Sequence, residues 1–164
     1  MYFDVLNQTN AQPGVLAFPQ AMLQEDLEAA FLRFGQEMVG PGVRFRIVLE
    51  GQPRPLHPLI QEESYRIGRE ALLNAFRHSG ATRVELYLKY TPTGLHIGVH
   101  DNGKGISADL LHLGCDGLRF MHEVAERIGA KLKLLSRVKA GTEILLFIPR
   151  EISFASQTVS RVCA

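Results

Sequence analysis

The sequence contains only two cysteines, no long apolar run and no excess of charge of either sign, and each of these shortages excludes a class of protein. Cys115 and Cys163 are too few for a disulfide framework and lack the spacing of a metal site, which favours a reducing compartment. The 18 basic and 17 acidic residues give a net charge of +1, whereas nucleic-acid and membrane-surface binders usually carry a basic excess. There is no signal peptide and no apolar segment long enough to cross a bilayer. We therefore expect a cytoplasmic domain without direct contact with nucleic acid or membrane.

One domain is expected from the length of 164 residues, which is enough to bury a sizeable core. Residues 1–19 mix Asn, Gln, Pro and Gly with apolar residues, which is typical of a linker or a lead-in from a missing upstream region. Residues 20–150 would form the domain itself. Residues 151–164 show no clear pattern and are expected to be a C-terminal tail.

Apolar residues recur with two kinds of spacing along residues 20–150. Intervals of three and four predict amphipathic helices, and alternation predicts half-buried strands. The predicted helices cover residues 20–38, 56–79 and 118–128, and the predicted strands cover residues 43–50, 83–90, 95–100, 131–137 and 142–149. Helices on one face of a mixed, mostly antiparallel sheet would bury all the apolar faces at once. We therefore predict a two-layer α/β sandwich with three main helices on one face.

Three polar residues stand four apart in the second predicted helix: Glu70, Asn74 and His78. Residues at this spacing are stacked on one helix face, so a carboxylate, a carboxamide and an imidazole would form a line. The spacing alone fits a solvated face better than a functional site. The opposite, apolar face would be formed by Leu59, Ile60, Ile67, Ala71 and Leu72.

A second polar stretch, Asp101-Asn102-Gly103-Lys104-Gly105, follows a predicted strand. It could be an ordinary turn. It could equally fix a carboxylate at a strand end beside glycines that let a ligand approach the backbone. Such a carboxylate would accept a hydrogen bond from the exocyclic amine of a base and so select adenine over guanine. Backbone N–H groups of the following loop, and the helix beginning near Gly117, would then face phosphates.

Four segments together resemble the sequence boxes of bacterial sensor histidine kinases, over roughly residues 26–149. Residues 65–81 resemble the N box, and Asp101-Asn-Gly103-Lys-Gly105-Ile106 resembles the first glycine box. Residues 114–121 resemble the second glycine box in the Gly-x-x-Gly-Leu-x-x-Met form of the NarL/DesK-like subfamily. Residues 140–142, followed by an apolar strand, resemble the terminal Gly-Thr motif. The resemblance implies the GHKL (Bergerat) ATP-binding fold and binding of ATP with Mg²⁺.

The resemblance also implies a role for each matching residue. Asn74 would coordinate Mg²⁺ through its amide oxygen, and Asp101 would bind the adenine amino group. Two residues would serve catalysis, Glu70 by orienting or polarising a metal-bound water and His78 by facing the phosphates. The remaining ATP-binding residues would be Gly103 and Gly105 in the floor, Gly114 and Gly117 in the lid, Thr142 through a shared water, and Ile106 and Leu118.

Asp116 fits this pattern less well, because a carboxylate between the lid glycines should repel a triphosphate. The milder interpretation makes it the N-cap of the helix beginning near Leu118. If it faced the phosphates instead, Lys104 and Arg119 would be the nearby cations that offset it.

The chain lacks a histidine in a phosphoacceptor motif and a helix resembling the dimerisation region of these kinases. We therefore predict the catalytic ATP-binding domain of a two-component sensor kinase. It would pass the γ-phosphate to a histidine in a separate dimerisation domain. A response regulator would be a further partner, and a membrane segment could anchor the parent protein. The piece itself would be monomeric. An anti-sigma-factor-type serine kinase and a nucleotide-sensing regulatory module of the same fold are the alternatives.

Overall fold

A computed structural model describes residues 26–107 and 116–154, which form one sheet and four helices within those ranges. The elements follow in the order α1 (Leu27–Met38), β1 (Arg44–Glu50), α2 (Pro58–His78), β2 (Arg83–Thr91), β3 (Gly94–Asp101), α4 (Asp116–Arg127), β4 (Lys131–Arg137), β5 (Gly141–Pro149) and α5 (Arg150–Ser153).

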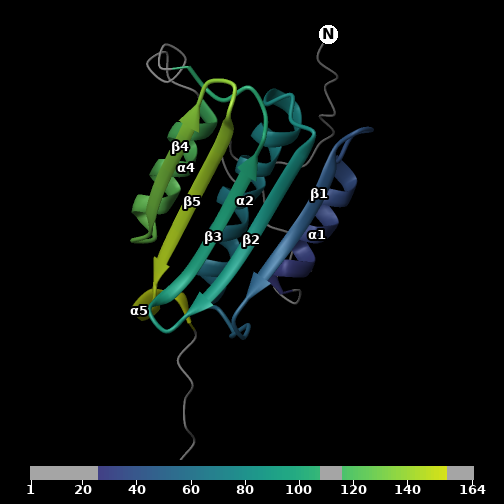
Figure 1. The fold of residues 1–164 in the computed structure, drawn as a ribbon. Helices are drawn as coiled ribbons and strands as arrows, with labels where there is room; N and C mark the ends of the chain where they lie inside the picture. Colours follow the sequence, from purple (N-terminus) through teal and green to yellow (C-terminus); the bar gives the residue numbers. More distant parts are fainter. Residues whose placement is uncertain (1–25, 108–115, 155–164) are drawn as a thin grey trace, which may run out of the picture.

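The five strands lie in the order β1-β2-β3-β5-β4. β1 is parallel to β2, and the other three neighbouring pairs are antiparallel. Figure 1 shows α1, α2 and α4 on one face of this sheet, and no helix of the described residues covers the other face. The predicted two-layer sandwich with a mixed, mostly antiparallel sheet is therefore confirmed.

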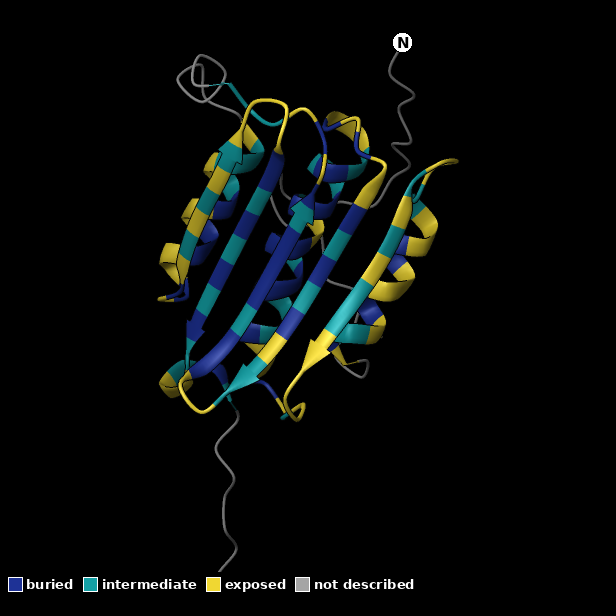
Figure 2. Cartoon of the chain, in the orientation of Figure 1, coloured by how far each residue is buried: buried dark blue, intermediate teal, exposed yellow. Residues whose placement is uncertain are grey.

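The core lies between the sheet and the three long helices (Figure 2). Alternate residues of the central strands point into it, and the helices supply large side chains that are fully buried. One close contact joins α1 to α2: a Cβ on Gly68 would lie 2.4 Å from Cζ of Phe31, so only glycine lets this ring approach. The central core residues are Phe31, Ile67, Leu72, Leu86, Leu88, Leu95, Met121 and Ile148.

The first two helices begin and end where local chemistry dictates. The helix predicted from residue 20 begins instead at Leu27, because Asp26 is extended and its carboxylate accepts a hydrogen bond from the Ala29 N–H at 2.8 Å. Pro58 opens α2, and Gly80 follows its end with a φ of +65°. The second predicted helix is confirmed, but it begins two residues later than predicted, because Leu56 pairs with Phe154 instead. The linker predicted at residues 1–19 lies outside the described residues.

The start of the predicted C-terminal tail packs against the domain. Residues 150–153 form α5, and the Ser153 hydroxyl donates to the Ile148 carbonyl at 2.8 Å. The carbonyl of Ser153 accepts the His57 N–H at 3.0 Å, and Phe154 pairs with Leu56. Four residues are too few to show a period, which is why no helix was predicted there. Residues 155–164 lie outside the described residues.

Candidate functional site

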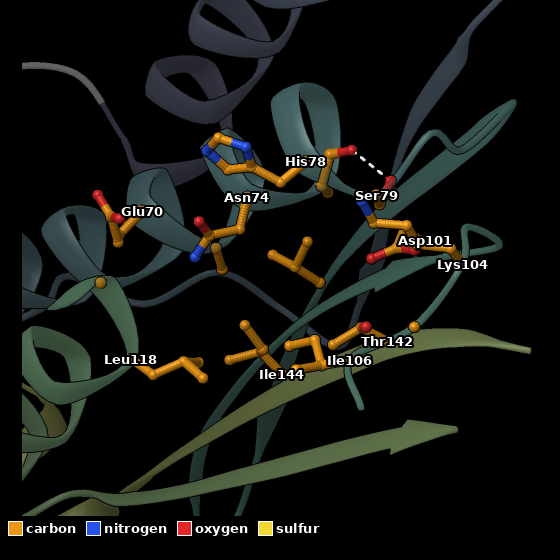
Figure 3. Close-up of a pocket in the computed structure, with 15 residues that line it drawn as sticks. Glu70, Asn74, His78, Ser79, Asp101, Lys104, Ile106, Leu118, Thr142 and Ile144 are labelled. Carbon is orange, nitrogen blue, oxygen red and sulfur yellow. Dashed lines mark hydrogen bonds between the residues drawn. The ribbon is translucent and has the colours of Figure 1, made fainter. Parts of the chain in front are cut away.

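A cavity of about 390 Å³ opens between α2, the end of β3, the loop that follows it, the start of α4 and β5 (Figure 3). All of the predicted site residues line it except two. Gly103 lies beside it, and Gly114 lies outside the described residues. The predicted residues that line the cavity are Glu70, Asn74, His78, Asp101, Gly105, Ile106, Gly117, Leu118 and Thr142.

The polar line on α2 forms one wall of this cavity. Glu70, Asn74 and His78 come from successive turns of the helix and all line the cavity, with the first two half-buried and His78 exposed (Figure 3). The face is therefore not merely solvated, because it borders the cavity.

Asp101 closes the far end of the cavity from the last position of β3, where it is only 5% exposed. Its Oδ1 accepts the Gly103 N–H at 2.8 Å. Burial raises the pKa of this carboxyl above its usual range, although hydrogen bonds from the Gly103 and Thr142 backbone and the charge of His100 act in the opposite direction. A Cβ on Gly103 would lie 2.4 Å from the Ser79 carbonyl oxygen, so the turn under Asp101 requires glycine.

The loop after β3 is fixed to the β4–β5 hairpin. The Lys139 N–H donates to the Lys104 carbonyl at 2.8 Å, and the Ile106 N–H donates to Ser136 Oγ at 2.8 Å. Gly105 has a φ of +72°, and a Cβ there would lie 2.2 Å from the Arg137 carbonyl oxygen. The hairpin therefore supports the floor of the cavity. Sequence reasoning missed Ser136, although its position opposite Thr142 follows from the register of the predicted hairpin.

The start of α4 covers the other end. A Cβ on Gly117 would lie 2.4 Å from Glu70 Oε1 and 3.4 Å from Asn74 Nδ2. Asp116 belongs to the first turn of α4, so the predicted helix start near Leu118 is two residues too late. The Asp116 side chain is 91% exposed, contacts Arg119 at 3.1 Å and does not line the cavity. It therefore points to solvent and away from the space that phosphates would occupy.

Residues 60–152, more than half of the chain, match the model of the histidine kinase-, DNA gyrase B-, and HSP90-like ATPase family. The chain belongs to this family. It is 37% identical over 90 residues to the sensor histidine kinase LiaS of Bacillus subtilis, covering 55% of this chain and 25% of LiaS. It is 34% identical over 107 residues to the sensor protein VraS of Staphylococcus epidermidis, covering 65% of this chain and 31% of VraS. The chain thus spans about a quarter to a third of the length of these relatives.

Solved structures agree with this ATPase fold. The histidine kinase domain of the Erythrobacter litoralis EL346 blue-light activated histidine kinase superposes with a TM-score of 0.64 at 21% identity, covering 77% of this chain and 62% of that domain. The ATP binding domain of PrrB from Mycobacterium tuberculosis superposes with a TM-score of 0.57 at 22% identity, covering 76% of this chain and 94% of PrrB's domain. The chain therefore carries an ATP-binding catalytic domain of the kind found in two-component sensor kinases.

In this ATPase domain, α4 is also bound to α2 away from the cavity. The Glu63 carboxylate is 7% exposed, and Arg127 contacts it at 2.9 Å. Arg66 contacts the same carboxylate at 3.3 Å and lies 5.2 Å from the centre of the Phe120 ring. The sequence did not reveal this cluster, because a glutamate in an amphipathic helix is usually solvated.

The donors for a metal ion at this site are few. Among the described residues no three His, Cys, Asp or Glu side chains come close enough to hold a metal ion. The cavity offers the Asn74 amide and the Glu70 carboxylate instead. This donor set suits Mg²⁺, which keeps several waters and takes the rest of its ligands from phosphates. Within residues 26–107 and 116–154, no helix combines the length and apolar character needed to span a bilayer.

Proposed function

We propose that the chain is the catalytic domain of a NarL/DesK-like sensor histidine kinase, which binds Mg·ATP and supplies the γ-phosphate to a histidine in a separate dimerisation domain. The observation that carries this proposal is that one cavity has Asn74 near one end and Asp101 at the other. The spacing Gly114-x-x-Gly117-Leu118-x-x-Met121 supports the subfamily. The domain would span residues 20–150, with residues 1–19 as its lead-in and 151–164 as its tail.

Each wall of the cavity would perform one part of the binding. Asp101 accepts a hydrogen bond from the adenine amino group, and the glycine turn beneath it holds the carboxylate in place through the Gly103 N–H. Asn74 contributes an amide oxygen to Mg²⁺, which would neutralise charge on the phosphates. Glu70 orients a water beside that site. Lys104 lines the cavity and attracts the triphosphate, and His78 lines the wall that faces the phosphates.

The nucleophile would come from outside the described residues. We infer that the dimerisation domain lies in the parent protein or acts in trans, that a response regulator receives the phosphoryl group, and that the isolated piece is monomeric. The domain would work in the cytoplasm, and a membrane segment could anchor the parent. Most of the catalytic effect would come from positioning and charge stabilisation, since phosphoryl transfer requires little covalent chemistry from the protein.

Titration with a fluorescent ATP analogue in the presence of Mg²⁺ tests the proposal. We expect Asn74→Ala and Asp101→Ala to weaken binding strongly, and Glu126→Ala on the exposed side of α4 to leave it unchanged. Binding at the wild-type level in both cavity variants would refute the assignment. Transfer from ATP to the dimerisation region should give an acid-labile phosphohistidine, whereas an acid-stable phosphoserine would favour a serine kinase of the same fold.

A further inference from the structure

The Ser136 hydroxyl lies among three polar groups on the β4–β5 hairpin. Its Oγ accepts the Ile106 N–H at 2.8 Å, lies 3.2 Å from the Gly141 carbonyl oxygen and lies 3.0 Å from the Thr142 hydroxyl. Ser136 and Thr142 are opposite each other in the antiparallel register. Ser136 itself does not line the cavity, but Ile106 and Thr142 do.

The positions of the two hydroxyl oxygens leave the direction of their bond open, and the donor and acceptor count favours one direction. A serine hydroxyl has one proton and two lone pairs. The Ile106 N–H can only donate, so it takes one lone pair. The Gly141 carbonyl can only accept, so it takes the proton. Only a lone pair remains for Thr142, whose hydroxyl must therefore donate. If Ser136 donated to Thr142 instead, the Gly141 carbonyl would not receive the Ser136 proton, and one acceptor fewer would be satisfied.

This direction determines what Thr142 offers to a ligand. Its proton points to Ser136, so the lone pairs of the hydroxyl face the cavity. Asp101, whose carboxylate can only accept when ionised, is paired with Thr142 in the register of β3 and β5. This end of the cavity thus presents acceptors from two neighbouring strands. A 6-amino group donates directly to these acceptors, whereas a 6-carbonyl oxygen placed against them has no proton to share.

We propose that Ser136 is a specificity-determining positioning residue: by accepting the Thr142 proton it holds that hydroxyl as an acceptor and strengthens the preference for 6-aminopurine over 6-oxopurine nucleotides. The inference rests on the proposed function, since it concerns the base end of the ATP site. It assigns Ser136 a role that Asp101 alone does not explain, because the carboxylate is present whichever way the Thr142 hydroxyl points.

The test is the ratio of the dissociation constants for ITP and ATP, measured by calorimetry on the full chain with Mg²⁺. These nucleotides differ only at the purine, which is 6-oxo in ITP. In Ser136→Ala the Thr142 hydroxyl can turn and donate to the carbonyl, so we expect the ratio to fall by about fivefold, the effect of one net hydrogen bond. Ser136→Thr keeps the hydroxyl and should retain the wild-type ratio. Thr93→Ala, which removes a hydroxyl at the opposite end of β3, is the matched control.

A second variant keeps the inference testable if Ser136→Ala does not fold. Thr142→Val removes the acceptor itself and should lower the ratio by a similar factor, since a valine no longer opposes the carbonyl oxygen. An unchanged or higher ratio in Thr142→Val, or an unchanged ratio in a folded Ser136→Ala, would overturn the inference while leaving the ATP site intact. Failure of the wild-type chain to bind ATP at all would overturn the proposed function and the inference with it.

Discussion

Replacing Gly117 by alanine should damage the site without damaging the fold. The new methyl group would lie 2.4 Å from Glu70 Oε1, well inside van der Waals contact. The atom that it meets is the free end of a flexible side chain, so Glu70 can rotate away. The structural cost would therefore be a changed glutamate conformation at the end of the cavity that the start of α4 covers.

Two opposing contributions set the change in the free energy of unfolding. Alanine is favoured over glycine in a helix by about 1 kcal/mol. Forcing Glu70 out of its preferred conformation costs about 0.5–1.5 kcal/mol. The two nearly cancel, so we expect the stability of Gly117→Ala to remain within about 1 kcal/mol of the wild-type value. The Mg·ATP affinity should fall by roughly tenfold or more, as expected for the loss of a charge-assisted contact. Adenosine affinity should not change, because the Asp101 end is untouched.

Gly103→Ala provides the contrast. Its methyl group would lie 2.4 Å from the Ser79 carbonyl oxygen, which is backbone and cannot rotate away. This variant should lose both stability and adenosine binding. Urea unfolding followed by circular dichroism, together with calorimetry for Mg·ATP and adenosine, separates the two cases. Wild-type Mg·ATP affinity in Gly117→Ala, or a loss of stability as large as in Gly103→Ala, would refute the reasoning.

Three further outcomes are expected. Because burial raises the pKa of Asp101, the folded protein holds the carboxyl proton of Asp101 more tightly than the unfolded chain does. The stability that this carboxyl group contributes is therefore present at low pH and lost as pH rises. Urea unfolding should give Asp101→Asn a free energy of unfolding at least equal to that of the wild type at neutral pH. As the pH is lowered toward about 4, the wild type should gain stability relative to this variant. The variant should no longer bind ATP. Arg127→Met should lower the free energy of unfolding by about 1 kcal/mol, since it leaves the buried Glu63 carboxylate with one partner fewer. Adding Glu63→Gln should recover part of the lost stability. Strictly additive effects in the double variant would contradict the pairing of Arg127 with Glu63. Phe154→Ala should lower stability by about 2 kcal/mol, roughly half the cost for a fully buried ring, whereas no change would show that Phe154 does not hold the start of α2.

The parts that the sequence predicted well are those that local chemistry determines. The second helix is long, begins at a proline and ends two residues before Gly80, and its polar residues repeat every four positions. Its boundaries and its polar face could therefore be predicted without knowledge of its neighbours. Short turns fixed the β2–β3 and β4–β5 hairpins in the same way, and the second of these placed Thr142 on the strand that borders the cavity.

The errors concern contacts between distant elements. Leu59 was assigned to the apolar face of α2, yet it is 51% exposed. It lies one turn before Glu63, which pairs with Arg127, the last residue of α4. Leu59 therefore extends past the end of α4, and no helix among the described residues covers it. Periodicity identifies which side chains share a face, but it does not say where the covering element stops.

The same pairing explains how the start of α4 finds its place. The two helices run antiparallel, with Arg127 beside Glu63, Phe120 beside Arg66 and Gly117 beside Glu70. A shift of α4 by one residue would move it about 1.5 Å along α2 and could bring the Asp116 carboxylate toward the Glu70 carboxylate, where like charges repel. The ion pair between Glu63 and Arg127, which are 64 residues apart, therefore favours the position of α4 at which Gly117 faces Glu70. A helix fixed only by apolar packing could slide, because apolar contacts are not directional.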